Sequence, residues 1–482
     1  MGTGTAERRD GETADAPTQL PRELTLRDLV LFNIVAIVSL RWFATAAAAG
    51  PSSISLWILA ALFFFVPQGL AVSDLSARYP DEGGIYAWTK RAFGDGHGFL
   101  CGWCYWVNNI LYYPNLLIST AVVGAYVIGR GDTALATQWT YVLPATLIAL
   151  WLATWVNMVG LKTGRWLQNA GAVGTYVPGL LLVALGIYAA MTRPSATPLS
   201  VRTLVPDLGA LSELNLWASI AFAFAGIELC AVMGDEIHDP RRTLPRSIYL
   251  SAPFVAFIYI AGTLAVLWLI PTKDVNIVSG FLQAIAVGAK DFGWGITWLP
   301  IAGAALYVVG NIGGVGAWLT GPARVAFVIG LDRYFPPAFG KIHPRWKTPY
   351  VVLLTQAVLA TIFLFLSVVG KGTTVEKAYL VILDTMLLVY FIPYLYLFAT
   401  YLKDGNEREG GQVHLAPFRL FRPFRPLRLL TGISGLALTL FAMGVATVPP
   451  SDTDPWVFRL KVIGGAGFFV VLGLVIYWRG RK

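Results

Sequence analysis

The sequence predicts an all-α membrane protein with 12 transmembrane helices. Of the 482 residues, 56% are hydrophobic and only 13% are charged, a composition too apolar for a water-soluble globular domain. The apolar residues gather into runs of about 20, the length that an α-helix needs to cross a hydrocarbon core of about 30 Å. Because backbone polar groups in lipid must bond within their own segment, these runs are expected to be helices.

Charged residues and breaks that contain Pro or Gly set the predicted ends of the helices. The preceding tail, residues 1–26, is polar and has no apolar signal-peptide core, so it is expected to stay in the cytoplasm. Residues 403–428 form a basic cytoplasmic loop, and residues 429–482 hold the last two helices and a short tail. The predicted helices span residues 27–49, 54–77, 98–128, 139–160, 165–191, 213–236, 247–270, 295–325, 350–369, 375–402, 429–448 and 456–478.

The distribution of basic residues supports this order of helices. Lys and Arg accumulate on the cytoplasmic side of membrane helices. With a cytoplasmic N-terminus, most of the 36 Lys and Arg residues fall in predicted cytoplasmic segments. An even number of spans then places both termini in the cytoplasm, for a protein expected in the plasma membrane. Basic loops beside anionic lipid explain the net charge of +9, so membrane lipid is an expected partner and nucleic acid is not.

Charged residues inside the predicted helices mark a candidate site. Arg41 lies in the first helix, Glu228 in the sixth and Asp384 in the tenth. A charge at the bilayer centre costs at least about 2.5–3.5 kcal/mol, so such residues normally face a partner or a water-filled cavity. In one interpretation, Arg41 only closes a buried ion pair with Glu228 or Asp384. In the other, Arg41 binds substrate while Glu228 and Asp384 serve coupling or gating.

The sixth predicted helix contains the sequence FAFAGIE at residues 222–228. Gly226 beside a buried acid fits either close helix packing or a local break in the helix. A break exposes N–H groups for a carboxylate and carbonyl groups for a cation, so Ala225 and Gly226 are expected at the substrate, with Phe222 as an aromatic lid. The 4 histidines lie far apart, and neither a metal site nor a cofactor is predicted.

Three blocks of sequence resemble the amino acid–polyamine–organocation superfamily of permeases. They are GGIYAWTKRAFG at 83–94, FAFAGIE at 222–228 followed by GDEIHDPRRTLPRSI at 234–248, and GPARVAFVIGLDRYFP at 321–336. The resemblance implies a transporter core over residues 27–402 with a LeuT-like fold. In that fold, five plus five helices form an inverted repeat, helices 1 and 6 are discontinuous around the substrate, and two additional helices follow at the C-terminus.

The resemblance also implies where helix 1 binds the substrate. By position, its unwound part corresponds to Ser39, Leu40 and Arg41, followed by Trp42. The family usually has a Gly-x-Gly pattern here, whose backbone amides bind the substrate carboxylate. This sequence has no glycine at these positions, so Arg41 is expected to replace or supplement the amides with a bidentate grip on a carboxylate.

Other helices contribute further implied site residues. Asn109 and Trp318 match positions that touch substrate in similar exchangers, although either could instead serve packing or interhelical bonding. Phe222 takes the place of an aromatic gate, and Glu228 matches an acid linked to gating or proton coupling.

The leading hypothesis is a secondary active transporter for amino acids or related small amines and carboxylates, working by alternating access with proton coupling or exchange. The alternative is a polyamine or non-amino carboxylate transporter of the same fold. The sequence has no cluster of nucleophile and base, which argues against an enzyme, and no continuous polar stripe, which argues against a channel. The exact substrate, coupling ion, symport or exchange, transport direction and oligomeric state are left open.

Overall fold

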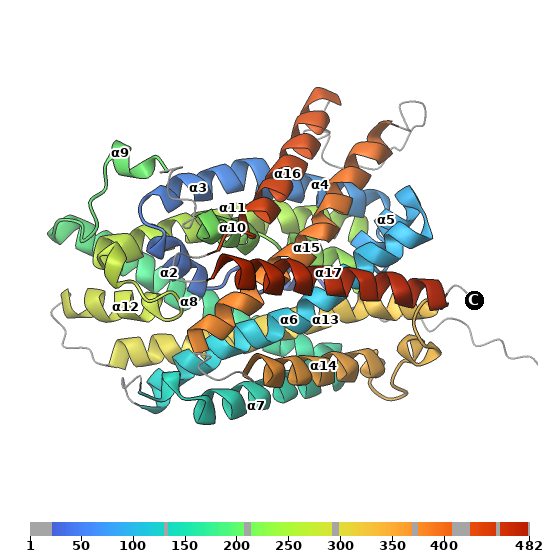
Figure 1. Ribbon diagram of the computed structural model, residues 1–482, viewed down its shortest axis with the longest axis horizontal. Coiled ribbons are helices and arrows are strands. Elements are labelled where there is room, and N and C mark those ends of the chain that lie inside the picture. Colours follow the sequence, from blue (N-terminus) through green and yellow to red (C-terminus); the bar gives the residue numbers. More distant parts are fainter. Residues whose placement is uncertain are drawn as a thin grey trace, which may run out of the picture.

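The computed structural model describes residues 22–129, 134–206, 214–291, 298–368, 375–406, 425–449 and 454–480. These residues are mostly helical, and the described ranges contain no strand beyond an isolated bridge between Leu24 and Ile237. Many of the long helices run side by side along the long axis of the molecule (Figure 1). The elements are α1 (Leu26–Ile37), α2 (Arg41–Ala48), α3 (Ser52–Ala60), η1 (Ala61–Phe65), α4 (Val66–Arg78), α5 (Ile85–Phe93), α6 (Asp95–Ile128), η2 (Ala134–Thr137), α7 (Trp139–Met158), α8 (Leu161–Thr192), α9 (Val201–Leu204), α10 (Leu214–Ala223), η4 (Ile227–Glu236), α11 (Pro240–Leu269), η5 (Thr272–Asp274), α12 (Gly280–Asp291), α13 (Trp298–Leu331), η6 (Pro337–Gly340), α14 (Tyr350–Val368), α15 (Val375–Asn406), α16 (Arg425–Val445) and α17 (Pro455–Gly480).

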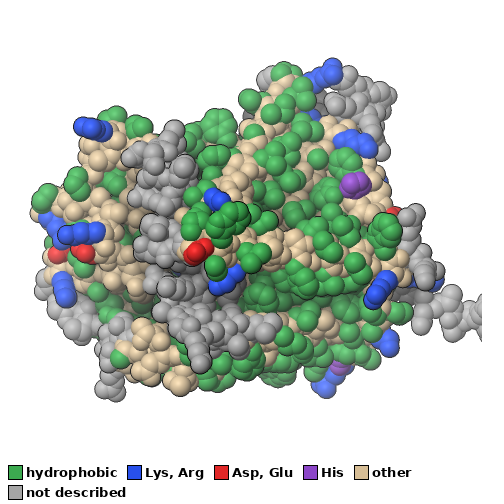
Figure 2. Space-filling model, viewed as in Figure 1, with side chains coloured by type: hydrophobic (Ala, Val, Ile, Leu, Met, Phe, Trp, Pro, Cys, Tyr) green, Lys and Arg blue, Asp and Glu red, His purple; other side chains and the backbone are tan. Residues whose placement is uncertain are grey.

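Within the described residues, 11 helical segments are long and apolar enough to cross a membrane. The predicted span 350–369 corresponds to α14, whose described apolar part, Tyr350–Phe365, is shorter, so the count of twelve stays a prediction. Large hydrophobic side chains such as Trp456 (80% exposed) and Leu460 (75%) face outward, and hydrophobic side chains cover much of the face in Figure 2. Lipid is the solvent that such a surface needs, and the chain is an integral multi-pass membrane protein.

Two of the predicted membrane helices are interrupted. The first stops at Ile37 and resumes at Arg41, so residues 38–40 separate α1 from α2. The sixth stops at Ala223 and resumes at Ile227 as the tighter 3₁₀ helix η4. Gly226 in this second break has a φ of 119°, and a Cβ there would lie 2.9 Å from the Trp318 ring. Both the backbone angle and the close approach require glycine at this position.

The packing of the helices places both breaks inside the bundle. The long helices α6 and α13 pack against each other, and α13 also contacts α1, α8 and η4. On the other side, α11 packs against α1, α2 and α4. Two shorter helices occupy segments for which the sequence predicted no helix: α5 packs on α6, and α12 packs on α8 and α13. The C-terminal α16 and α17 pack on α15 at the outside of the bundle (Figure 1).

Candidate functional site

The hydroxyl of Tyr259 on α11 connects the two breaks. It lies 3.3 Å from the Ser39 N–H, 2.6 Å from the Ile37 carbonyl and 3.1 Å from the Ala223 carbonyl. Interrupted helices leave backbone groups without intrahelical partners, and these groups must bond elsewhere when buried. A hydroxyl both accepts and donates, so one side chain serves the end of α1, the break that follows it and the end of α10.

Trp318 on α13 supports the same region from the opposite side. Its Nε1–H donates to the Ala36 carbonyl near the end of α1 at 2.8 Å. Its own backbone carbonyl accepts from the Tyr113 hydroxyl at 3.1 Å. The indole therefore stabilises the first break while its ring fills the space that the missing Cβ of Gly226 leaves. Trp318 thus has a structural contact in addition to the implied contact with substrate.

Aromatic side chains contact one another next to the two breaks. Ring centroids are 6.0 Å apart for Trp42 and Phe222, and 5.4 Å apart for Phe222 and Tyr390. The chain of contacts continues from Tyr390 to Trp318 at 5.8 Å and from Trp318 to Tyr112 at 5.0 Å. These five residues, called here the aromatic ring, come from α2, α10, α15, α13 and α6 and are each at most 5% exposed. They form a buried, largely apolar group of contacting side chains.

Arg41 links the two ends of the aromatic ring. Its guanidinium carbon lies 4.6 Å from the centroid of the Trp42 ring and 5.6 Å from that of Tyr112. Its Nη1 donates to Oδ1 of Asn115 on α6, and the side chain is 0% exposed. Contacts with aromatic faces stabilise a guanidinium that water does not reach. The arrangement places a guanidinium beside an apolar surface, and a guanidinium is the side-chain group that pairs with a carboxylate through two parallel hydrogen bonds.

Glu228, 0% exposed, is surrounded by neutral hydrogen-bond donors. The donors and their distances to the carboxylate are Tyr105 Oη (3.1 Å), Tyr394 Oη (2.7 Å), Gln68 Nε2 (2.9 Å), the Gly226 N–H (3.1 Å) and Tyr390 Oη. Within the described part of the chain, Arg41 is not one of these donors. Tyr390 also belongs to the aromatic ring, so it connects this carboxylate to the group of side chains that contacts Arg41.

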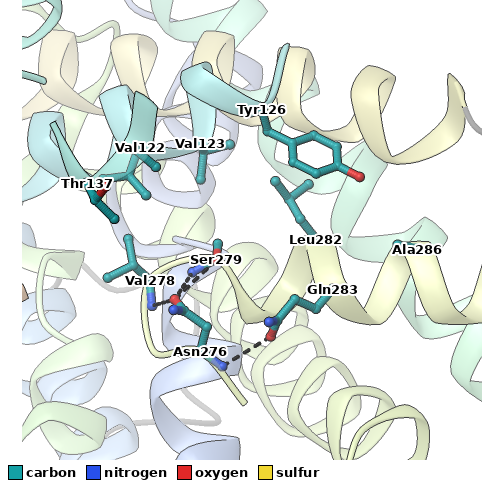
Figure 3. A pocket seen from close by; sticks show the side chains of 11 residues that line it. Val122, Val123, Tyr126, Thr137, Asn276, Val278, Ser279, Leu282, Gln283 and Ala286 are labelled. Atoms are coloured by element: carbon teal, nitrogen blue, oxygen red, sulfur yellow. Dashed lines mark hydrogen bonds between the residues drawn. The ribbon is translucent and has the colours of Figure 1, made fainter. Parts of the chain in front are cut away.

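A cavity of about 350 Å³ lies farther along α6. Val122, Val123 and Tyr126 form its α6 wall, and the segment 276–286, with Leu282 and Gln283 of α12, faces them (Figure 3). Val122 and Tyr126 follow Asn115 at helical spacing, on the same face of α6. Between Asn115 and the cavity, the hydroxyls of Ser119 and Tyr307 are 2.7 Å apart, and the Tyr307 ring stacks on Phe281.

The structure places most of the predicted site residues around the two breaks. Ser39 and Leu40 lie in the first break, and Ala225 lies with Gly226 in the second. Asn109 is on α6, but its Nδ2 donates to the Tyr105 carbonyl of the same helix at 2.7 Å. Asp384 is in α15, and its side chain lies outside the described residues, as does the question of an Arg41–Asp384 pair.

Sequence reasoning missed the neutral groups that complete the site. Tyr390 and Tyr394 stand one turn apart on α15, and Gln68 is an isolated amide in an apolar run. That spacing places both tyrosines on one face of the helix. The pattern is a usable signal, but aromatic residues also fill ordinary cores, so the sequence does not identify Glu228 as their partner.

The fold is that of a polytopic membrane protein with two broken helices inside its bundle. A sequence model of the amino acid permease family matches residues 24–469. The chain belongs to this family, which confirms the expected membership of the amino acid–polyamine–organocation superfamily. The family consists of transporters, and the chain is not an enzyme.

Curated relatives match most of the chain. An uncharacterized transporter of Legionella pneumophila is 29% identical over 467 residues, which cover 93% of this chain and 95% of the relative. A probable agmatine/putrescine antiporter of Lactococcus lactis is 24% identical, over 95% of both chains. A glutamate/gamma-aminobutyrate antiporter of Lactococcus lactis is 23% identical, over 82% of this chain and 78% of the relative. The solutes in these names differ in charge, so similarity leaves the substrate to be argued from the site.

Proposed function

We propose that this protein is a secondary active transporter that moves amino acids or related small carboxylates and amines across the plasma membrane by alternating access. The proposed architecture has twelve spans, cytoplasmic termini and an inverted repeat of five plus five helices over residues 27–402. Family membership supports the class of solute. The interruptions in the first and sixth membrane helices support the repeat, because an inverted repeat brings equivalent breaks together at the substrate.

The enclosure of Arg41 by the aromatic ring is the observation that carries the proposed substrate class. A planar guanidinium binds a carboxylate through two parallel hydrogen bonds, and the low dielectric of a buried site strengthens the attraction. The same charge repels a diamine, so the site favours substrates with a carboxylate over polyamines. Arg41 then takes the role that backbone amides of a glycine-rich break would otherwise have.

Uptake into proteoliposomes by the wild type, Arg41→Gln and Arg41→Lys tests this assignment. For carboxylate substrates, Arg41→Gln is expected to raise KM by about 10- to 100-fold, the loss of a charged hydrogen bond. Arg41→Lys should fall in between, because it keeps the charge and loses the bidentate geometry. Arg91→Gln, at a side chain 54% exposed, is the matched control.

Two results of the uptake experiment would contradict the proposal. Unchanged KM values for every carboxylate in Arg41→Gln, with protein of normal thermal stability, would refute the role of Arg41. Efficient uptake of putrescine by the wild type without uptake of any carboxylate would favour the polyamine alternative.

Proton coupling is proposed to run through Glu228. Tyrosine hydroxyls can donate to a carboxylate or accept from a protonated carboxyl, so the surroundings of Glu228 suit both forms. Tyr390 then transmits a change in the protonation of Glu228 to the aromatic ring, where the substrate is proposed to lie. Obligate exchange is the alternative mode, and counterflow at matched pH distinguishes it from proton symport.

The cavity beside α12 is the proposed entrance from the external side. By the predicted topology α6 runs outward, so Val122 and Tyr126 lie on the external side of Asn115. The hydrogen bond between Ser119 and Tyr307 lies between this cavity and Asn115 and separates the two. Opening of this contact would join the cavity to the aromatic ring.

A further inference from the structure

Asn108 on α6 is a buried amide that has no hydrogen-bonding partner in the part of the chain that the structure describes. The residue is 0% exposed, and neither its Nδ2 nor its Oδ1 bonds to any of the described residues. Leaving both donor and acceptor of an amide unsatisfied in a protein interior costs free energy, and native structures retain few such groups. The bonds of this amide are therefore expected to be made to something that enters the protein.

The position of Asn108 on the helix directs it toward the site. At about 100° per residue, its direction from the α6 axis lies between those of Tyr112 and Asn115. Tyr112 contacts Trp318 and Arg41, and Asn115 bonds to Arg41. Along the helix axis, Asn108 lies about 6 Å from Tyr112 and about 10 Å from Asn115, toward the N-terminal end of α6. It therefore shares the face of α6 that carries the site and lies one turn farther from Arg41.

Tyr105 bounds this region on the other side of Asn108. Its hydroxyl donates to Glu228, and its ring lies 5.6 Å from that of Tyr390. The face of α6 thus presents, in order, the partner of Glu228, the unsatisfied amide, a member of the aromatic ring and the partner of Arg41. Along α6, the unsatisfied amide therefore lies on the other side of Tyr112 from Asn115, the partner of Arg41.

We propose that Asn108 binds the end of the substrate remote from Arg41. This inference rests on the proposed function and adds a substrate class to it: elongated molecules with a carboxylate at one end and a hydrogen-bonding group at the other. The carboxylate binds Arg41, the aliphatic part lies against Tyr112 and Trp318, and the amide binds the distal group. Its Oδ1 accepts from an ammonium or amide N–H, and its Nδ2 donates to a carbonyl or carboxylate oxygen.

The test measures uptake of norvaline, glutamine, glutamate and ornithine into proteoliposomes by the wild type and Asn108→Leu. These amino acids share a five-carbon chain and differ at its end. The wild type should prefer the polar-tipped substrates, and Asn108→Leu should reduce that preference about tenfold, the effect of one hydrogen bond, through KM. Uptake of norvaline should stay unchanged or improve.

Asn108→Asp gives a second readout that does not depend on the leucine variant. Aspartate only accepts hydrogen bonds when ionised and carries a negative charge, so the preference should move from glutamate toward ornithine. Equal changes for all the substrates in both variants, or no change, would overturn the role of Asn108 while leaving the proposed function intact. A wild type that transports none of these amino acids and no other carboxylate would overturn the proposed function and, with it, this inference.

Thermal unfolding separates a binding role from a structural one. Asn108→Leu removes an unsatisfied amide, so the melting temperature of the ligand-free protein should rise. Asn157→Leu is the matched comparison, because the Asn157 amide bonds to Thr320 and to the Ala153 carbonyl, each at 2.8 Å, and its loss should lower the melting temperature. A lower melting temperature for Asn108→Leu would mean that the amide bonds within the protein, and the proposal would be wrong.

Discussion

Glu228 and Glu236 lie on the same short helix η4 and are both buried, at 0% and 1% exposed, yet their surroundings differ. The Glu236 carboxylate pairs with Arg324 of α13, with Nη2 2.9 Å from Oε1. Glu228 bonds instead to hydroxyl and amide groups without charge. Glu236 thus bonds to a charged partner, whereas the groups around Glu228 are uncharged and include hydroxyls, which can donate as well as accept.

The backbone contacts near the two acids also differ. The Glu236 carbonyl accepts from the N–H groups of Glu23 and Leu24, and the Gly83 N–H donates to the Val232 carbonyl at 3.1 Å. The end of η4 is thus bonded to the N-terminal segment and to the loop before α5. Glu228 instead lies beside the break at Gly226. The contacts of Glu236 are therefore those of a structural residue, and Glu228 is the candidate for the proposed coupling.

Breaking the ion pair should have the largest effect on stability. Glu236→Gln leaves Arg324 as an uncompensated buried charge and is expected to cost about 3–5 kcal/mol of folding free energy. The double variant Glu236→Gln/Arg324→Met should recover part of the loss. Thermal unfolding in detergent measures both, with Asp81→Asn in the exposed Arg91–Asp81 pair as the control, expected to cost less than about 1 kcal/mol. A loss no larger than that of the control would contradict the structural role of Glu236.

Glu228→Gln should change transport more than it changes stability. The glutamine side chain carries no charge and retains a carbonyl acceptor, so a loss of about 1–2 kcal/mol is expected. Uptake measured between pH 5 and pH 8 should lose its pH dependence. Tyr390→Phe should weaken the response of substrate affinity to pH. Tyr396→Phe should not, because the Tyr396 hydroxyl, also on α15, bonds to His97 and not to Glu228. A pH profile in Glu228→Gln identical to that of the wild type would exclude this acid as the coupling group.

Tyr259→Phe examines the junction of the two breaks, where the Tyr259 hydroxyl bonds to backbone groups of Ser39, Ile37 and Ala223. Removing the hydroxyl leaves buried backbone groups unsatisfied and is expected to cost about 1–3 kcal/mol. Uptake should slow with little change in KM, because the residue joins the breaks without contacting the proposed substrate. Tyr307→Phe removes one hydroxyl bond to Ser119, and a melting temperature as low as that of Tyr259→Phe would contradict a special role for the junction.

The smallest expected effect is the pH dependence of stability contributed by Glu82, in the loop before α5. Burial raises the pKa of this carboxyl well above its usual range, and the nearby negative charge of Glu236 raises it further, while Arg324 partly offsets the shift. The folded protein therefore holds the proton more tightly than the unfolded chain, and stability falls as pH rises from the unfolded pKa toward the folded one. Melting temperatures at pH 5 and pH 8 should differ less in Glu82→Gln than in the wild type; an equal difference would rule out this contribution.

Part of the site was accessible from the sequence. Arg41 and Glu228 stand out because a charge in an apolar run is costly wherever it lies, and Gly226 stands out beside the acid. The partners of these residues were not accessible. The neighbours Asn108 and Asn109 look alike in sequence, but only the first has an amide without any bond among the described residues, while the second bonds to the Tyr105 carbonyl.

The sequence by itself determined that the chain is a bundle of membrane helices, approximately where they begin and end, and to which superfamily they belong. Burial in lipid depends on the composition of a continuous segment, which can be read locally. Only the tertiary structure decided that Tyr259 joins the breaks, that Tyr390 links Glu228 to the aromatic ring and that Arg324 pairs with Glu236. Such contacts depend on the rotation and depth of each helix against its neighbours, which interhelical packing and hydrogen bonding set together.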